Sequence, residues 1–389
     1  MITFLASLFI KDRRNYDSPA VRQAYGVLSG AVGIGLNILL FLGKWIAGTL
    51  SGSIAITADA FNNLSDAGSS IITLVGFKMA GAPADTEHPF GHGRIEYISG
   101  LIVSLIIIMM GFELLKSSIE KIITPETVAF HMLSVIILVV SICVKGWMCL
   151  FNRKLGGLIG SAAMQATAMD SLSDVAATSA VLLGTLVGAG TGWALDGYLG
   201  VVVALFIMYT GFSTAGDTLR PLLGKAPDRE FVEEIYQTVM AYDDVVGVHD
   251  LVVHDYGPGR CMISLHAEVP CDADILKMHD IIDMIEHSLH EKFQCNAVIH
   301  MDPIVTDDEV TNKMHRRVIA LVQQIDKSLS VHDFRMVQGP THTNLIFDVV
   351  IPFNFRLKDS EVVEAIQRGV QEMEGHTYYA VVNVDKSYV

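Results

Sequence analysis

The sequence predicts an α-helical membrane protein with six transmembrane helices, followed by cytoplasmic α+β modules. Three observations support this fold class. Six apolar stretches are long enough to span a bilayer, the acidic residues gather in the C-terminal part, and one order of helices and strands occurs twice. The apolar content of 51% over 389 residues fits a chain that is part membrane protein and part soluble protein.

The six apolar stretches account for the first half of the chain. A hydrocarbon core of about 30 Å requires about 20 mostly apolar residues per helix. The stretches lie at 24–48, 53–77, 97–115, 129–151, 161–187 and 193–213. We therefore expect a six-helix transmembrane domain at 21–215. The shorter apolar run "MITFLASLFI" cannot span, so 1–20 is interpreted as a cytoplasmic N-terminal segment.

The basic residues predict the orientation of these helices. If both termini share one side, that side receives most of the lysines and arginines between the spans, and the opposite side receives only Lys116 and Lys121. The positive-inside rule then predicts a multi-pass protein of the cell membrane with both termini in the cytoplasm. Lys44 and Lys145 lie within spans, where we expect snorkelling or a pairing role rather than a role in transport.

Composition excludes several classes of function. Residues 228–389 carry 13 basic and 28 acidic residues, whereas residues 1–227 carry 14 of each, so the net charge of −15 belongs to the C-terminal part. An acidic domain of this kind disfavours nucleic-acid binding. The five cysteines show no CxxC spacing, which predicts neither a disulfide framework nor a thiolate metal site.

The C-terminal part reads as one module present twice. A helix at 228–241, strands at 246–255 and 260–269, a helix at 274–291 and a strand at 296–302 predict a small sheet with helices on one face, at 226–304. The motif "VHDLVVHDYGP" of this module is echoed by "VHDFRMVQGP", and both His249/His332 and Asp302/Asp385 are 83 residues apart. A constant offset predicts a duplicated module at 307–389.

Polar residues inside two spans point to a binding site. Asn62 and Asp66 are four residues apart, and Asp170 and Asp174 share that spacing, so each pair lies on one helix face. Asp59 lies three residues before Asn62. A carboxylate at bilayer depth costs at least ~2.5 kcal/mol, which packing alone does not explain. One amide and three carboxylates form an all-oxygen set, which favours Mn²⁺, Mg²⁺ or Ca²⁺ over Zn²⁺.

Three segments resemble a known family. "SGSIAITADAFNNLSDAGSS" (51–70), "GHGRIEYISG" (91–100) and "ATAMDSLSDVAATS" (166–179) are similar to the second-, third- and fifth-span signatures of the cation diffusion facilitator family. The resemblance covers residues 20–304. It implies a homodimeric antiporter of divalent cations and protons, in which the transmembrane domain transports and the cytoplasmic domain has a ferredoxin-like or metallochaperone-like fold.

The resemblance also bears on the transported ion. Zinc transporters of the family usually have His or Asp where Asn62 stands, and commonly His where Asp170 stands. The set in this chain resembles the manganese-exporting branch, so we expect Mn²⁺ to be exported from the cytoplasm. The alternative is efflux of zinc or iron(II) by the same mechanism, with cobalt and cadmium as further candidate ions. No redox or organic cofactor is expected.

Two further groups match metal positions of the family. The loop "ADTEHPFGHGR" contains Asp85, His88 and His92, whose spacing suits one ion; the alternative is a structural turn that anchors the third span. In the first module the residues that match the regulatory site at the dimer interface are His249, His266, His279, His300 and Asp302. Their counterparts in the second module are His332, Asp348, Asn383 and Asp385, and this copy is expected to serve packing or dimerisation.

The carboxylates also suggest how transport is driven. Asp66, Asp170 and Asp174 crowd like charges into a low-dielectric site, so with no metal bound one or more should hold a proton. Metal and protons then exclude each other, and Asp59 could relay the protons. A rival interpretation is a membrane-anchored metal sensor. An enzyme such as an intramembrane metalloprotease is not expected, since the spans contain no HExxH motif. The chain shows no phosphate loop, so we expect an ion gradient rather than ATP to supply the energy.

Overall fold

The structure is a computed structural model that describes residues 10, 16, 18–51, 54–124, 132–191, 196–374 and 377–387. The chain divides into two compact units. One comprises Met1–Lys225 with the short segment Asp255–Arg260, and the other comprises Ala226–His254 with Cys261–Val389.

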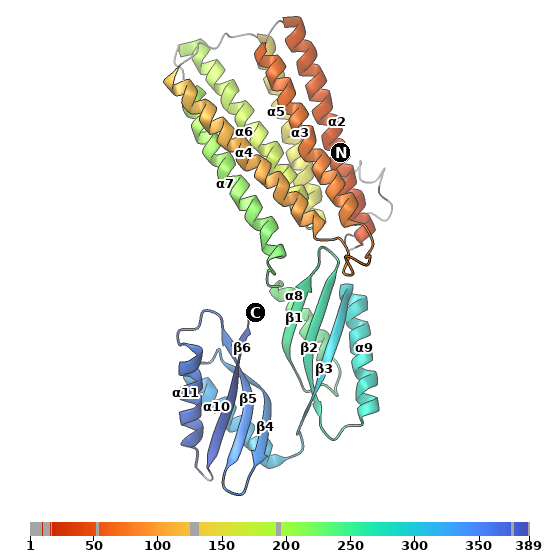
Figure 1. Cartoon of the computed structure of the whole chain (residues 1–389), viewed down its shortest axis with the longest axis vertical. Helices are drawn as coiled ribbons and strands as arrows, with labels where there is room; N and C mark the ends of the chain where they lie inside the picture. Colours follow the sequence, from red (N-terminus) through yellow and green to blue (C-terminus); the bar gives the residue numbers. More distant parts are fainter. Residues whose placement is uncertain are drawn as a thin grey trace. The chain divides into compact units, whose positions relative to one another are not determined.

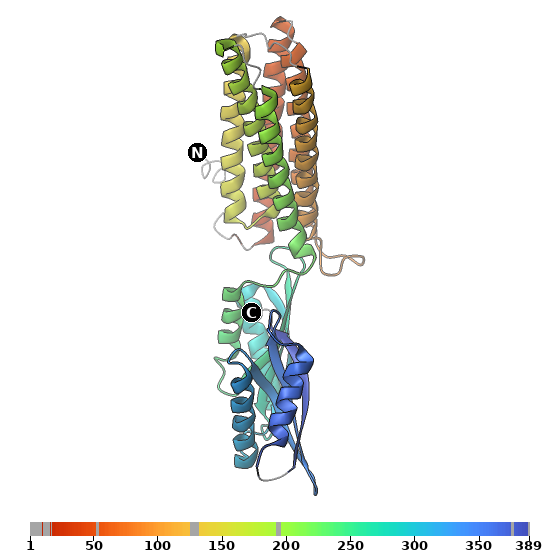
Figure 2. The same ribbon diagram turned by 90° about the vertical axis from the view of Figure 1, so that its left-hand side faces the viewer.

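In the part of the first unit that the structure describes, six long helices run alongside one another in both views (Figures 1 and 2). They are α2 (Pro19–Ser51), α3 (Ile54–Ala80), α4 (Ile95–Ile123), α5 (Met132–Leu158), α6 (Ala162–Thr191) and α7 (Asp196–Leu222). The predicted membrane domain of six helices is confirmed. Asp59 lies in α3, but its side chain is outside the described ones.

Four of these helices, α2, α4, α5 and α7, are long and apolar enough to cross a membrane by length and composition alone. Within the described residues, α3 and α6 do not reach that level. These two helices carry the intramembrane Asn and Asp residues, whose polar side chains lower the hydropathy of their segments. The weakest apolar signal therefore belongs to the helices that form the candidate site.

Close packing holds these polar helices in the bundle. A methyl group on Gly30 of α2 would lie 2.5 Å from Cβ of Leu74 on α3, so only glycine permits this approach. The hydroxyls of Thr73 on α3 and Thr167 on α6 lie 2.8 Å apart, in hydrogen-bond contact. Helix α3 is thus fixed between α2 and α6.

The second unit contains the two predicted α+β modules (Figure 1). The first comprises α8 (Arg229–Val239), β1 (Gly247–Asp255), β2 (Cys261–Pro270), α9 (Ile275–Phe293) and β3 (Cys295–Ile304). The second comprises α10 (Glu309–Ile325), β4 (Ser330–Gln338), β5 (Thr343–Pro352), α11 (Asp359–Gln371) and β6 (Tyr378–Ser387). The sheet orders β1-β2-β3 and β4-β5-β6 correspond, and β2/β3 and β5/β6 are both parallel pairs.

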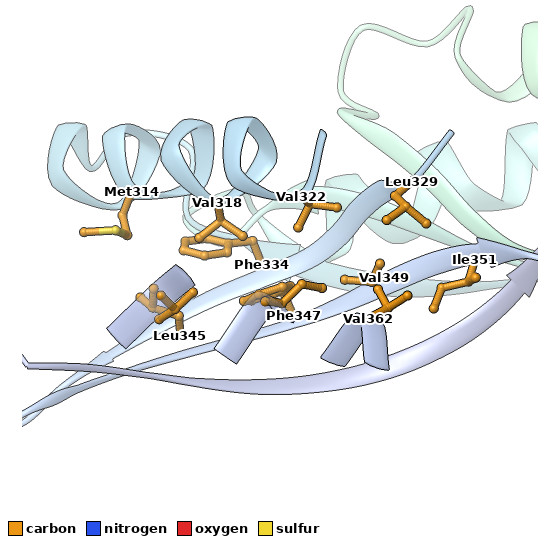
Figure 3. Packing of buried hydrophobic residues seen from close by; sticks show 12 residues of the cluster. Met314, Val318, Val322, Leu329, Phe334, Leu345, Phe347, Val349, Ile351 and Val362 are labelled. Atoms are coloured by element: carbon orange, nitrogen blue, oxygen red, sulfur yellow. The ribbon is translucent and has the colours of Figure 1, made fainter. Parts of the chain in front are cut away.

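Each sheet has one face covered by its two helices. Side chains alternate across a strand, so Ile263, Leu265 and Ala267 of β2 are buried in the core cluster formed with α8 and α9. Figure 3 shows the same arrangement in the second module, where Val318 of α10 faces Phe347 of β5. The alternate residues of β2, β3, β5 and β6 point to the opposite face, which we call the open face.

The prediction that the cysteines form no disulfide is wrong at one place. Cys261 and Cys295 are disulfide-bonded, because β2 and β3 are parallel neighbours that pair these two residues in register. The sequence spacing could not reveal this contact, since 34 residues separate them. Cys143, Cys149 and Cys271 are free.

Candidate metal centres

The intramembrane carboxylates converge on a buried lysine. Lys145 of α5 donates hydrogen bonds from Nζ to Oδ2 of Asp66 on α3, at 2.7 Å, and to Oδ2 of Asp174 on α6, at 2.6 Å. The three side chains are buried or nearly so. Of the two roles expected for Lys145, pairing is therefore the one that the structure has. One ammonium joins the two polar helices.

Asp170 adds a third carboxylate to this group. It lies one helical turn before Asp174 and is 4% exposed. Its Oδ1 is buried and has no hydrogen-bond partner in the part of the chain that the structure describes. The carboxylates of Asp66, Asp170 and Asp174 thus lie near one another on α3 and α6, and their role as metal ligands remains a prediction.

Asn62 is placed differently from these carboxylates. It is exposed, whereas Asn63, its neighbour in the same turn of α3, is buried. The contacts described for Asp66 and Asp174 do not include Asn62. Its share in a metal site remains a prediction.

In the first cytoplasmic module, three imidazoles surround Asp302 on the open face. His266 Nδ1 lies 2.8 Å and His249 Nε2 lies 3.1 Å from Oδ2 of Asp302, and His300 Nε2 lies 3.4 Å from its Oδ1. The register explains this, since β2 and β3 pair His266 with His300. Because the two oxygens of Asp302 face different histidines, this carboxylate could bridge two ions.

His279 is not brought to this cluster within one chain. It lies on α9, which covers the opposite face of the sheet, and its Nδ1 is 3.8 Å from Oδ1 of Asp283. Its side chain is 65% exposed. Its share in a metal site at a dimer interface remains a prediction.

A second cytoplasmic cluster lies where the two modules meet. Asp250 of β1 joins His332 of β4 and Asp385 of β6, with ligand atoms all within 4.8 Å of one another. Burial raises the pKa of Asp385, and the charges of Asp250 and Asp348 raise it further. Asp348 itself accepts a hydrogen bond from Asn383 at 2.8 Å. The sequence linked His332 and Asp385 to each other but did not link them to Asp250.

The loop between α3 and α4 brings Asp85, His88 and His92 together, and their role as a metal site remains a prediction. Asp85 lies 3.3 Å from His88 Nδ1 and 3.5 Å from His92 Nε2. The backbone N–H of His88 donates to Asp85 at 2.6 Å, and this bond holds the pKa of the carboxyl below its ordinary value. The ionised carboxylate and two imidazoles could together hold one ion.

The chain matches two family models across these sites. Residues 31–223 match the cation efflux transmembrane domain, and residues 227–304 match the cytoplasmic domain of cation efflux proteins. The chain belongs to the cation efflux (cation diffusion facilitator) family. This family consists of transporters, not enzymes, and its members are multi-pass membrane proteins with a cytoplasmic C-terminal domain.

Curated relatives of this cation efflux protein agree with that assignment. The "Uncharacterized transporter MJ0449" of Methanocaldococcus jannaschii is 33% identical over 267 residues, which are 68% of this chain and 94% of the relative. The "Cation-efflux pump FieF" of Escherichia coli is 28% identical over 288 residues, or 73% of this chain and 95% of the relative. Residues 305–389 lie beyond both family models.

Proposed function

We propose that this protein exports divalent cations from the cytoplasm in exchange for protons, through Asp66, Asp170 and Asp174, and that it works as a homodimer. Mn²⁺ is the expected ion. The observation that carries the proposal is the pair of short hydrogen bonds from Lys145 to Asp66 and Asp174. These carboxylates already hold a positive charge between two helices of a family of cation transporters.

Charge accounts for the exchange. Three carboxylates opposite one ammonium leave an excess of negative charge in a site shielded from water, and protons neutralise that excess when no metal is bound. A divalent cation from the cytoplasm replaces these protons at the same oxygens. Protons from the other side then replace the metal once the site opens there. Mutual exclusion at one site needs no nucleotide.

The donor set supports a hard ion. The buried ligands are all carboxylate oxygens, which suit Mn²⁺ better than Zn²⁺. Efflux of zinc or iron(II) by the same mechanism is the alternative. The cytoplasmic cluster at Asp302 suggests regulation, since the occupancy of this cluster would follow the metal concentration in the cytoplasm. His279 is exposed on α9, where it could bind a metal ion together with residues of a second copy of the chain in a homodimer.

Flux into proteoliposomes tests the proposal. Asp66→Asn, Asp170→Asn and Asp174→Asn should each abolish Mn²⁺ transport, because each removes an anionic ligand without changing the side-chain shape. Asp217→Asn is the control, since Asp217 is exposed on α7 and pairs only with Arg220 among the described residues. Retained transport in the Asp170→Asn/Asp174→Asn double variant would contradict the site.

Proton coupling has its own readout. Calorimetric heats of Mn²⁺ binding should depend on the ionisation enthalpy of the buffer, because metal binding releases protons. An inward proton gradient should accelerate efflux. Equal heats in all buffers, together with flux that ignores the gradient, would show a uniporter instead.

A further inference from the structure

The second module lies beyond the ranges that the family models match, and its contacts with the first module suggest what it does. The imidazole rings of His249 on β1 and His332 on β4 stack with centroids 4.4 Å apart. The backbone N–H of Asp333 donates to Oε1 of Glu268 on β2, at 3.2 Å. Both contacts lie at one end of the sheets, close to Asp302 and Asp385, while Val298 and Val381 farther along the open faces remain exposed.

The backbone of both modules is shaped in the same way at this contact. Asp250 and Asp333, which follow His249 and His332, have φ angles of 51° and 50°. Aspartate is among the few residues that adopt this left-handed conformation without large strain. In β4 the conformation coincides with a break in register between His332 and Arg335, and such bulges redirect side chains. The turn directs His332 toward the first module.

Some polar atoms at the contact are buried without a hydrogen bond, although the whole side chains of Asp250 and Asp385 are 37% and 36% exposed. Both ring nitrogens of His332 and Oδ2 of Asp385 are inaccessible to water and have no hydrogen-bond partner among the described residues. His332 Nε2 lies 3.1 Å from this oxygen, yet without hydrogen-bond geometry. Buried polar groups are seldom left unpaired, and such a group costs about 1–3 kcal/mol. A ligand is the simplest partner for them.

The charge around these atoms is negative. Asp250, Asp348 and Asp385 lie near one another, and no lysine or arginine of the described chain pairs with any of the three. One imidazole and two carboxylates are suitable ligands for a divalent transition-metal ion. Ligand atoms of one Zn²⁺ are about 3–4 Å apart, so atoms within 4.8 Å need only a small contraction.

We propose that a divalent cation binds Asp250, His332 and Asp385 and thereby fastens the second module to the first. The site adjoins the cluster at Asp302, since His266 Nδ1 lies 4.0 Å from Oδ2 of Asp250, but two of its three ligands lie beyond the family models. The second module thus binds the first module within the same chain.

Zinc titration of the full-length protein tests this site. Calorimetry with Zn²⁺ should show one ion fewer in Asp250→Asn and in Asp385→Asn than in the wild type. Asp348→Asn is the matched control, because Asp348 lies beside the cluster and pairs with Asn383. It should keep the wild-type number of ions. Unchanged stoichiometry in both Asp250→Asn and Asp385→Asn would overturn the proposal.

Hydrogen exchange separates docking from mere binding. Zn²⁺ should slow exchange in β4 and β6 of the wild type, and Asp250→Asn should remove that effect although the mutation lies in the first module. Asp250 is an exposed residue, so this variant keeps the test valid even if Asp385→Asn fails to fold. Zinc protection of β4 and β6 that survives in Asp250→Asn would also overturn the proposal.

A different observation carries a second inference, which rests on the proposed function. Lys145 occupies Oδ2 of both Asp66 and Asp174, the same atoms that an exported cation must reach. An ammonium and a metal ion cannot share these atoms. We infer that Lys145 is an internal competitor of the transported ion: it holds the two helices together in the empty site and must move aside when metal binds.

Transport kinetics in proteoliposomes test the role of Lys145. Lys145→Met removes the competing charge, so KM for Mn²⁺ should fall by about tenfold or more, the effect of one charge-assisted hydrogen bond. The maximal rate should fall as well, because protons must then displace the departing ion without the help of the Lys145 ammonium. Lys145→Arg retains the charge and should not lower KM. An unchanged or higher KM in Lys145→Met would overturn this inference.

The aspartate variants keep the two ideas separable. If Asp66→Asn and Asp174→Asn abolish flux while Lys145→Met leaves KM unchanged, the transport site stands and the competitor role fails. If the aspartate variants transport normally, the proposed function itself fails. A Lys145→Met protein that does not fold leaves Lys145→Arg as the test, and a KM for Mn²⁺ at least tenfold below wild type in that variant would contradict competition.

Discussion

The imidazole of His249 stacks on the imidazole of His332, although the two residues belong to different modules. Each histidine lies 3.1 Å from an aspartate of its own module, His249 from Asp302 and His332 from Asp385. The duplicated His–Asp pairs therefore lie side by side at one contact. Their neighbourhoods differ, since imidazoles surround Asp302 and carboxylates surround Asp385.

The first prediction concerns Asp302. Asp302→Asn should abolish high-affinity Zn²⁺ binding on the open face of the first module, because this carboxylate contacts all three histidines of the cluster. Titration calorimetry on the full-length protein measures the loss. His287→Ala is the control, since His287 is exposed and pairs with Glu291. Wild-type binding in Asp302→Asn would show that the ion binds elsewhere.

The second prediction concerns selectivity. Asp170→His introduces an imidazole among the buried carboxylates and should shift the ratio of transport rates from Mn²⁺ toward Zn²⁺. Asn62→His should have a smaller effect, since Asn62 is exposed. Asp170→Glu keeps an oxygen ligand and serves as the control. Flux in proteoliposomes gives the ratio, and an unchanged ratio in Asp170→His would place selectivity outside the ligand set.

The third prediction concerns the core of the second module. Phe347 is fully buried between the sheet and its helices (Figure 3), and Phe347→Ala should destabilise this module by about 3–5 kcal/mol. Hydrogen exchange of β5 in the full-length protein measures the free energy of opening. Phe353→Ala, at a residue that is 65% exposed, should change it by less than about 0.5 kcal/mol. Equal effects would place Phe347 outside the cooperative core.

The fourth prediction concerns pH. Asp308 caps α10 by accepting from the Thr311 hydroxyl and from the backbone N–H groups of Thr311 and Val310, and these bonds lower its pKa. Its contribution to stability is therefore complete above the ordinary aspartate pKa of about 3.9 and disappears as the pH falls through the lower folded-state pKa.

Hydrogen exchange of α10 checks this sign. Asp308→Ala should exchange faster than the wild type at pH 7, and the difference, corrected for intrinsic rates, should shrink below about pH 4. Asp307→Ala alters the preceding carboxylate and should leave α10 unchanged at either pH. A difference that persists undiminished at low pH would mean that the bonds of Asp308 do not depend on its charge.

Sequence reasoning succeeded where the pattern is local or exactly repeated. The spans, the strands and the correspondence of His249 with His332 follow from hydropathy, alternation and a constant offset. Sequence reasoning failed where two residues distant in the sequence come into contact only in the folded chain. Asp250 meets His332 only because the two folded modules touch at one end of their sheets, and no spacing in the sequence predicts that contact. The sequence identified Lys145 as a charged residue within a span, but it did not show that the partners of Lys145 lie on α3 and α6.

Two site residues show a further limit. Asn62 and Asp66 have ideal helical spacing, yet one is exposed and the other buried, because the neighbouring helices decide which part of a face is covered. His279 matches a family position but lies on a helix behind the sheet. A motif thus identifies candidate ligands, while the packing of one chain decides which of them meet.

The connection between the modules is short: β3 ends at Ile304 and α10 begins at Glu309. A tether of this length keeps the second sheet at an effective concentration in the millimolar range. Dilution or low expression therefore cannot separate the pair, whereas two copies of the chain must find each other by collision. Association of the duplicated sheets is a first-order event, set by the linker and not by how much protein the cell makes.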